Sequence, residues 1–204
     1  MDFENVLKWV AVATALSGWF KVFLDHLGNK PKLAGRILCV MKGRFKAENF
    51  GEHTSYMVYP YLVNKRKNTV HVLDYEFYVK LKRFGKWQQI LRVYGMEALP
   101  NCKFTSNSDS LIAIENLGNT LIYRKKEPVQ HGVPLHGWIP FFGDMSLFDL
   151  NSYRYKLICI DAYGNRHSIV SKGKEGINPY LLMEVAEIKL PSDMLPKNPL
   201  APVQ

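Results

Sequence analysis

The chain has 204 residues, of which 47% are hydrophobic and 22% charged, and it carries a formal net charge of +9 at pH 7. This length suits one domain with a short extension, and the composition is that of an ordinary globular protein. A wholly disordered chain, a collagen-like chain and a polytopic membrane protein are thereby excluded. The three cysteines, Cys39, Cys102 and Cys159, are an odd number, which argues against a disulfide scaffold and agrees with a reducing compartment.

Residues 1–29 differ in kind from the rest of the chain. The nineteen residues from Val6 to Leu24 would form a helix about 28 Å long, close to the hydrocarbon core of a bilayer at about 30 Å. The two lysines in this stretch lie within a turn of its ends, where long stems reach the headgroups. We therefore expect a single membrane span. The residues expected to mark it are Val6, Trp9, Leu16, Trp19 and Leu24.

Three other interpretations of this segment stay open. A helix lying on a membrane surface would place Thr14, Ser17, Gly18, Lys21 and Asp25 on one polar stripe. A helix docked on its own domain is the second alternative. A cleaved signal peptide is the third, although an acidic start disfavours it. If the helix spans, the small-residue pairs Ala11 with Ala15 and Thr14 with Gly18 favour self-association.

The positive charge is concentrated just after this segment. Residues 30–94 hold fourteen basic and four acidic residues, a net charge of +10, whereas residues 95–204 are balanced. Such asymmetry indicates an anionic partner, lipid headgroups or nucleic acid, with a solvated basic face as the plain alternative. By the positive-inside rule, the domain after a span would be cytoplasmic. The expected contacts with an anionic surface are Lys30, Lys32, Arg36, Lys65, Arg66 and Lys67.

From Leu33 onward the hydrophobic pattern alternates, as in β-strands. His71, Leu73, Tyr75, Phe77 and Val79 would share one face of the clearest strand. Pro60 should place its strand at an edge or mark a bulge, because proline cannot donate to a ladder. Hairpin turns are expected at 83–86 and 162–165. The expected strands are 33–46, 54–64, 69–82, 87–94, 111–115, 119–124, 135–143, 153–161 and 166–171.

The end of the chain has a different pattern. Asn178 and Pro179 form a helix start, and apolar residues recur at helical spacing up to the stop at Pro191. The proline-rich tail 191–204 is expected to be extended or disordered. We therefore divide the chain into a hydrophobic helix at 1–29, a β domain with a terminal helix at 32–190, and the tail.

Seven to nine short strands without intervening helices favour an antiparallel sandwich or barrel. The stretches Met57–Val72, Gly137–Phe142 and Tyr155–Asn165 resemble strands and turns of immunoglobulin-like β-sandwich domains. As a whole, the chain resembles uncharacterised single-pass bacterial membrane proteins in which a hydrophobic helix precedes such a domain. The resemblance is architectural, since the antibody-type Cys…Trp…Cys spacing is missing, and it assigns no site residues.

No motif for catalysis or cofactor binding occurs in the sequence. The spacings typical of zinc sites, phosphate loops and serine hydrolases are all missing. His131 and His136 lack acidic or cysteine partners nearby, and nothing fixes the separation of Asp144, Asp149 and Asp161. We therefore predict no cofactor and no catalytic or metal site.

The sequence thus predicts a non-enzymatic, membrane-tethered binding or scaffold module with an unknown protein partner. The alternative is a peripheral or soluble module that binds nucleic acid through basic and aromatic side chains. An enzyme with an unrecognised site is the third interpretation. The residues expected to contact nucleic acid are Lys65, Arg66, Lys67, Lys80, Lys82, Arg83, Phe84, Lys86 and Trp87.

Overall fold

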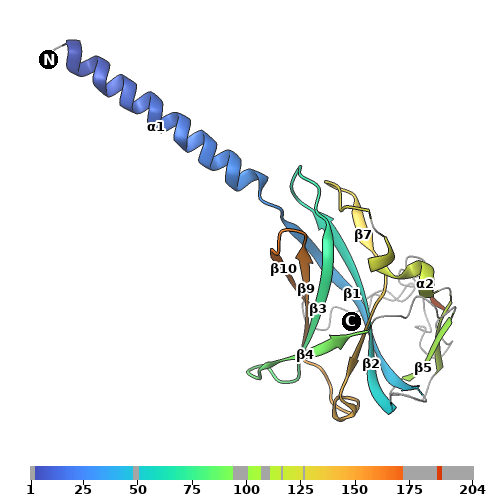
Figure 1. The fold of residues 1–204 in the computed structure, drawn as a ribbon. Coiled ribbons are helices and arrows are strands. Elements are labelled where there is room, and N and C mark those ends of the chain that lie inside the picture. The colour runs from blue at the N-terminus through green and yellow to red at the C-terminus, as the bar shows by residue number, and fades with distance from the viewer. Residues whose placement is uncertain are drawn as a thin grey trace, which may run out of the picture.

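A computed structural model describes residues 3–47, 51–93, 101–106, 111–115, 117–125, 127–171 and 188–189. It confirms a mainly β protein with one N-terminal helix (Figure 1). In chain order, the elements are α1 (Phe3–Asn29), β1 (Leu33–Ala47), β2 (Gly51–Asn64), β3 (Val72–Lys80), β4 (Trp87–Arg92), β5 (Asn101–Ser106), β6 (Leu111–Glu115), α2 (Leu117–Thr120), η2 (Ile122–Arg124), β7 (Pro134–His136), β8 (Ile139–Gly143), η3 (Met145–Leu147), β9 (Arg154–Asp161), β10 (Arg166–Val170) and β11 (Ile188–Lys189).

The strands form one antiparallel sheet in the order β10-β9-β3-β4-β8-β2-β1-β5-β6-β11, with β7 beside β2. The sheet curls, so that β10 packs against β1 although five strands lie between them in the order. The backbone N–H of Leu33 at the start of β1 donates to Nδ1 of His167 in β10 over 3.3 Å. Curling therefore brings two distant strands together at the point where the chain enters from α1.

A closed immunoglobulin-like sandwich is not confirmed, because β4 joins the two halves of the sheet. Its first part pairs with β3, where Ile90 lies opposite Phe77. Its last part pairs with β8, where Leu91 lies opposite Phe142. The hydrophobic pattern alone cannot reveal such a crossing, since it reports which face is buried and not which strand is the neighbour.

Aromatic side chains from both halves of the sheet fill the core. Phe77 of β3 lies against Phe141 of β8 with ring centroids 5.0 Å apart, and against Tyr56 of β2 at 5.8 Å. All three are fully buried, and Leu157 of β9 is buried in the same cluster. Burial of such large apolar side chains is the main favourable contribution to folding.

Pro60 marks a bulge, which is one of the two alternatives expected from the sequence. The pairing of β1 with β2 shifts register between Ile37 and Cys39, opposite Pro60. Leu38 is the extra residue, and the bulge fits a partner that has no N–H to donate. The edge position is wrong, because β2 lies between β1 and β8.

The predicted face of β3 is confirmed in its second half. Tyr75, Phe77 and Val79 are buried, whereas Leu73 is 66% exposed. The register between β3 and β9 shifts between Val72 and Asp74, and this irregularity breaks the alternation expected for the first residues. The two hairpin turns lie where they were expected.

The expected strand at 119–124 is wrong, because the short helices α2 and η2 occupy it. The expected strand at 135–143 is divided into β7 and β8 at Gly137, which has φ +153°. A Cβ atom there would lie 2.5 Å from the carbonyl oxygen of Thr120. The close approach of these two backbones therefore requires glycine, and it lets the N–H of Trp138 donate to that carbonyl over 2.8 Å.

The short C-terminal helix is not seen. Most of the expected segment after Asn178 lies outside the described residues, as does the tail 191–204. Ile188 and Lys189, which are described, form β11 and pair with β6. Strand β5 was not expected, since its sequence has no clear alternation of apolar residues.

We predict that the aromatic contacts of Phe77 hold the two halves of the sheet together. Phe77→Ala should lower the free energy of unfolding by about 3–5 kcal/mol, because it leaves a cavity in the core. Phe84→Ala is the control, since Phe84 is 91% exposed and its loss should cost within about 0.5 kcal/mol. Urea unfolding followed by near-ultraviolet circular dichroism measures both. Equal effects of the two substitutions would contradict this packing.

Candidate functional site

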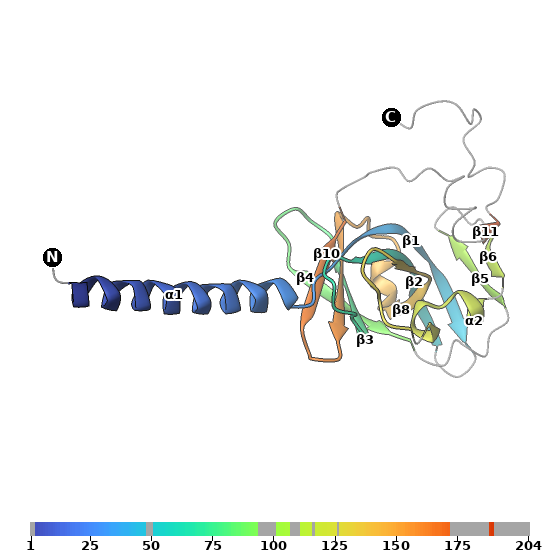
Figure 2. The same ribbon diagram turned by 90° about the horizontal axis from the view of Figure 1, so that it is seen from above.

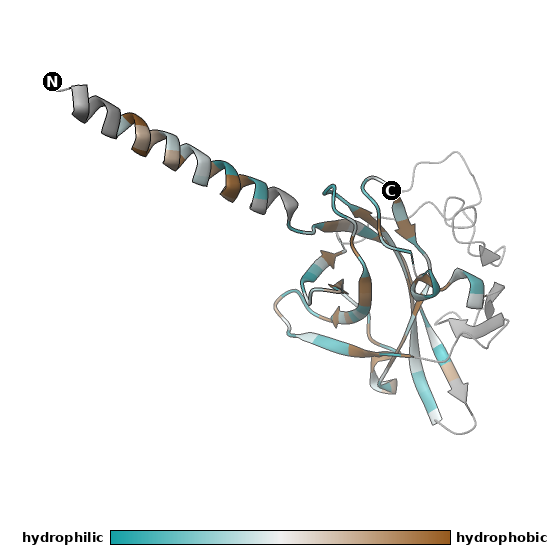
Figure 3. Ribbon diagram, turned by 45° about the horizontal axis from the view of Figure 1, so that its top comes forward, coloured by the Kyte–Doolittle hydropathy of each residue, from teal (hydrophilic) through white to brown (hydrophobic). Residues whose placement is uncertain are grey.

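Helix α1 projects away from the β domain in both views (Figures 1 and 2). Every side chain from Trp9 to Asp25 is exposed. The docked helix is therefore the wrong interpretation for these residues. Brown apolar segments recur along this free helix (Figure 3). Its exposed large apolar side chains are Trp9, Val10, Val12, Leu16, Trp19, Phe20, Val22, Phe23 and Leu24.

The hydroxyl groups of α1 are satisfied within the helix. Thr14 Oγ1 donates to the carbonyl of Val10, and Ser17 Oγ donates to the carbonyl of Thr14, each over 2.8 Å. These groups can leave water without losing their hydrogen bonds. Gly18 has open space around its Cα. Within the described part of the chain, no helix combines the length and hydropathy needed to cross a membrane.

Basic residues that are far apart in the sequence meet where α1 joins the domain. Leu33 pairs with Asn64, and the N–H of Lys65 donates to the carbonyl of Lys32 over 3.0 Å. The turn after β2 thus lies beside the linker after α1. Arg36 lies three residues further along β1, about 10 Å from Leu33. The residues gathered at the junction are Lys30, Lys32, Lys65, Arg66 and Lys67.

Asn64 fixes the basic turn. Its side chain is fully buried, and Nδ2 donates to the carbonyl oxygens of Asn68 at 2.6 Å and Val129 at 3.1 Å. Its Oδ1 accepts from the N–H of Arg66 over 3.0 Å. Because one amide closes the turn and ties it to a neighbouring segment, the three basic side chains start from a defined backbone.

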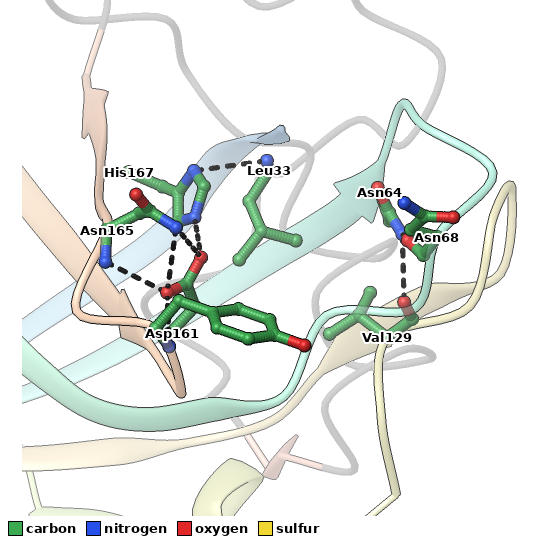
Figure 4. Close-up of polar contacts among 8 residues, drawn as sticks. Leu33, Asn64, Asn68, Val129, Asp161, Asn165 and His167 are labelled. Atoms are coloured by element: carbon green, nitrogen blue, oxygen red, sulfur yellow. Dashed lines mark hydrogen bonds and ion pairs between the residues drawn. The ribbon is translucent and has the colours of Figure 1, made fainter. Parts of the chain in front are cut away.

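A buried polar cluster holds the other side of the junction (Figure 4). Asp161 is 1% exposed and accepts hydrogen bonds from the N–H groups of Tyr163 and Asn165, each over 2.9 Å. It also accepts from Nδ2 of Asn165 and from Nε2 of His167, the latter over 2.9 Å. Asp161 thereby fixes the turn between β9 and β10 and orients the imidazole of His167.

The same network assigns the tautomer of His167. Its Nδ1 accepts from Leu33, so the ring proton lies on Nε2 and faces Asp161. Burial on its own would raise the pKa of Asp161. The hydrogen bonds from His167, Asn165 and Tyr163 outweigh burial and hold that pKa below its usual range. The charged carboxylate is thus the form that stabilises the junction.

The basic residues expected to bind nucleic acid are not brought together. The turn at Lys65–Lys67 precedes β3, and the hairpin with Lys82, Arg83 and Lys86 follows it. The nine residues of β3 therefore separate them by about 30 Å. On the sheet between them, Lys156 lies over the rings of Tyr78 and Trp87 at 4.4 and 4.8 Å. These aromatic faces already hold a cation, which leaves less room for a stacked base.

The acidic residues considered for catalysis also lie apart. Asp144 accepts from the N–H of Ser146 at the start of η3, beside the end of β2 remote from α1. Asp161 lies at the α1 end. Burial raises the pKa of the Cys39 and Cys159 thiols to about 12, so neither is a nucleophile at neutral pH. The side chain of Cys102 is outside the described residues.

The histidines singled out in the sequence have separate positions. His136 contacts the hydroxyl of Tyr59 at 2.7 Å and lies parallel to the ring of Tyr61. His131 is exposed in the loop before β7. Among the described residues, no group of three or more His, Cys, Asp or Glu side chains is placed to hold a metal ion.

A cavity of about 950 Å³ lies where β4 and β8 diverge. Its walls are mostly apolar, with Leu91, Phe142 and Leu147 among them, and His53 and Asp144 contribute polar atoms. The cavity is at the end of the domain remote from α1, so it is separate from the junction.

Comparison of the chain with protein-family models, with curated proteins and with solved structures found no match.

We predict that Asp161 makes folding sensitive to acid. Because its folded-state pKa is depressed, its stabilisation is complete above the ordinary carboxyl value of about 3.9 and is lost as the pH falls through the folded-state pKa. Asp161→Asn should cost about 1–3 kcal/mol at pH 7, since one donor then faces an amide NH2.

Urea midpoints at pH 7 and pH 3 test this prediction. The variant should lose less stability between the two pH values than the parent does. Part of the acid sensitivity should persist, because Arg166 holds the pKa of Glu76 below its usual range too. Glu127→Gln is the control, since Glu127 is exposed and should leave both midpoints unchanged. An unchanged acid response in Asp161→Asn would contradict the assigned role.

Proposed function

We propose that this protein is a membrane-tethered binding or scaffold module, in which α1 inserts into lipid and holds the β domain at the membrane surface. One observation carries the proposal: nine large apolar side chains of α1 are each about half or more exposed, on a helix that projects away from the domain. An apolar surface of this extent on a free helix calls for a partner phase.

The energetics favour lipid as that phase. Burying a large apolar side chain such as Leu16 or Phe20 contributes about 1.5–3 kcal/mol, so several together offset the cost of ordering a helix at a bilayer. Trp9 and Trp19 suit interfacial positions. Thr14 and Ser17 can enter the bilayer as well, because their hydroxyl groups are already hydrogen-bonded within the helix. The side chain of Val6 is outside the described residues.

The basic junction supports a cytoplasmic domain. Five lysine and arginine residues lie at the C-terminal end of α1, which is the side that the positive-inside rule keeps in the cytoplasm when a helix crosses. Cys39 and Cys159 are free thiols, in agreement with a reducing compartment. Self-association through Ala11, Ala15, Thr14 and Gly18 stays a prediction.

We assign a binding or scaffold role because the exposed features of the structure, an apolar helix and a basic turn, are surfaces suited to binding. We also propose that the domain is a variant of the immunoglobulin-like sandwich. The face-to-face packing of β2 and β8 on β3 and β9 supports this classification, and the double pairing of β4 is its departure from that plan.

A pair of neighbouring substitutions tests the insertion of α1 and its orientation. Leu16→Arg puts a charge among the apolar side chains, at a cost of about 2.5–3.5 kcal/mol at the centre of a span. We expect the membrane partition of the full chain to fall about a hundredfold. Circular dichroism should show an unchanged domain, because Leu16 makes no contact with it.

Ser17→Arg distinguishes the two orientations. Ser17 lies on the polar stripe, so a helix on the surface tolerates arginine there, whereas a crossing helix does not. Flotation with vesicles measures both variants. Release by both substitutions indicates a crossing helix, and release by Leu16→Arg alone indicates a surface helix. Unchanged flotation of both variants would contradict lipid insertion.

A further inference from the structure

Three loops converge at the end of the domain from which α1 leaves. The N–H of Gly132 donates to the carbonyl of Asn64 over 3.2 Å, which sets residues 130–133 beside the turn at 65–68. The N–H of Ala162 donates to the carbonyl of His71 over 2.9 Å, which sets the β9–β10 turn beside the start of β3. We call these three segments, 65–71, 130–133 and 162–165, the α1-side rim.

The rim presents exposed basic and apolar side chains together. Lys65 and Lys67 are exposed, and Arg66 is half-buried between them. Tyr163, at the tip of the β9–β10 turn, is 83% exposed, and Val133 is 53% exposed. Tyrosine and aliphatic side chains beside lysine and arginine are the usual composition of a surface that rests on lipid headgroups.

Two of the acidic groups near this end are paired with arginine. Asp74 pairs with Arg92 and Glu76 pairs with Arg166, whereas Asp161 keeps its negative charge, because His167 faces it as a neutral tautomer. Asp25 on α1 and the exposed Glu127, which lines the same pockets as His71 and Val133, also carry negative charge near the rim. The five basic residues of the junction, which include the turn at 65–67, outnumber the carboxylates of Asp161, Asp25 and Glu127 and leave a net positive potential at the rim.

We propose that the α1-side rim docks flat on an anionic phospholipid leaflet, with Tyr163 and Val133 at headgroup depth and Lys65, Arg66 and Lys67 on the lipid charges. This inference rests on the proposed insertion of α1 and adds the orientation of the domain and the chemistry of its lipid partner. The domain is then held in one pose and does not swing freely on its tether.

The geometry of the junction supports this pose. Only residues 30–32 separate α1 from β1, a reach of about 10 Å, so an inserted α1 leaves the rim within contact of the surface. The electrostatic attraction acts over a Debye length of about 8 Å at physiological salt. It therefore reaches the rim and not the β3–β4 hairpin, about 30 Å away.

The hairpin provides matched controls at the opposite end of β3. Lys82, Arg83 and Lys86 are exposed like Lys65 and Lys67 of the basic turn, and Phe84 is exposed like Tyr163. Replacing three basic residues with glutamate at either end changes the net charge equally. The paired variants are K65E/R66E/K67E with K82E/R83E/K86E, and Tyr163→Ser with Phe84→Ser.

The test uses the full chain in nanodiscs of phosphatidylcholine, with or without phosphatidylserine and with a spin label on some headgroups. Paramagnetic broadening of backbone amide signals reports which segments lie at the surface. With phosphatidylserine, amides of all three rim loops should broaden and those of the hairpin should not. K65E/R66E/K67E should weaken docking about a hundredfold or more, since each basic residue near an anionic surface is worth about a factor of five.

Tyr163→Ser should reduce the broadening of the rim, and both hairpin variants should leave it unchanged. High salt should remove the dependence on phosphatidylserine while the signals of α1 stay in lipid. Insertion of α1 without rim broadening that depends on phosphatidylserine would overturn the docking alone. Loss of α1 from the nanodisc would overturn the proposed membrane tether, and the docking with it. Equal broadening at the hairpin and the rim would also overturn the pose.

Discussion

The buried carboxylate of Asp161 ties together the end of the sheet from which α1 leaves. It holds the β9–β10 turn through two backbone N–H groups, and it fixes His167 in the tautomer that accepts from Leu33. Strands β1 and β10 are brought together by the curl of the sheet, but no ladder of backbone hydrogen bonds joins them here. A hydrogen bond from Leu33 to the side chain of His167 joins them instead. A neutral residue at 161 would leave several buried donors without a strong acceptor. The contact between the first strand and β10 at this end of the sheet therefore depends on this one charge.

Local chemistry was sufficient to predict many of the elements. Three sequence features determined only the structure nearby in the chain. They are the apolar alternation from Tyr75 to Val79, the missing N–H of Pro60 and the turn residues 162–165. A pattern of this kind is readable in the sequence, because its cause and its effect lie on the same segment. The N-terminal helix was predicted for the same reason.

The pairing of strands could not be predicted in the same way. Strand β4 shares its length between β3 and β8, and the backbone of Gly137 approaches that of Thr120 across 17 positions of sequence. These features depend on which segments become neighbours. Leu73 shows the consequence: it follows the apolar alternation, yet a register shift against β9 leaves it exposed.

Part of the candidate site could likewise be predicted from local sequence, and part depends on which strands pair. The apolar helix and the basic turn at Lys65–Lys67 are runs of one residue type, so the sequence showed both, but it placed neither end of β3 relative to α1. Val133 and Tyr163 lie 104 and 134 residues after Asn29, where α1 ends, in turns whose own sequences are ordinary. The pairing of β7 with β2 places the loop of Val133 near the linker, and the curl of the sheet places the turn of Tyr163 there. A surface assembled from separate turns becomes visible only when the topology is known, because its charged and apolar groups come from segments that are far apart in the sequence.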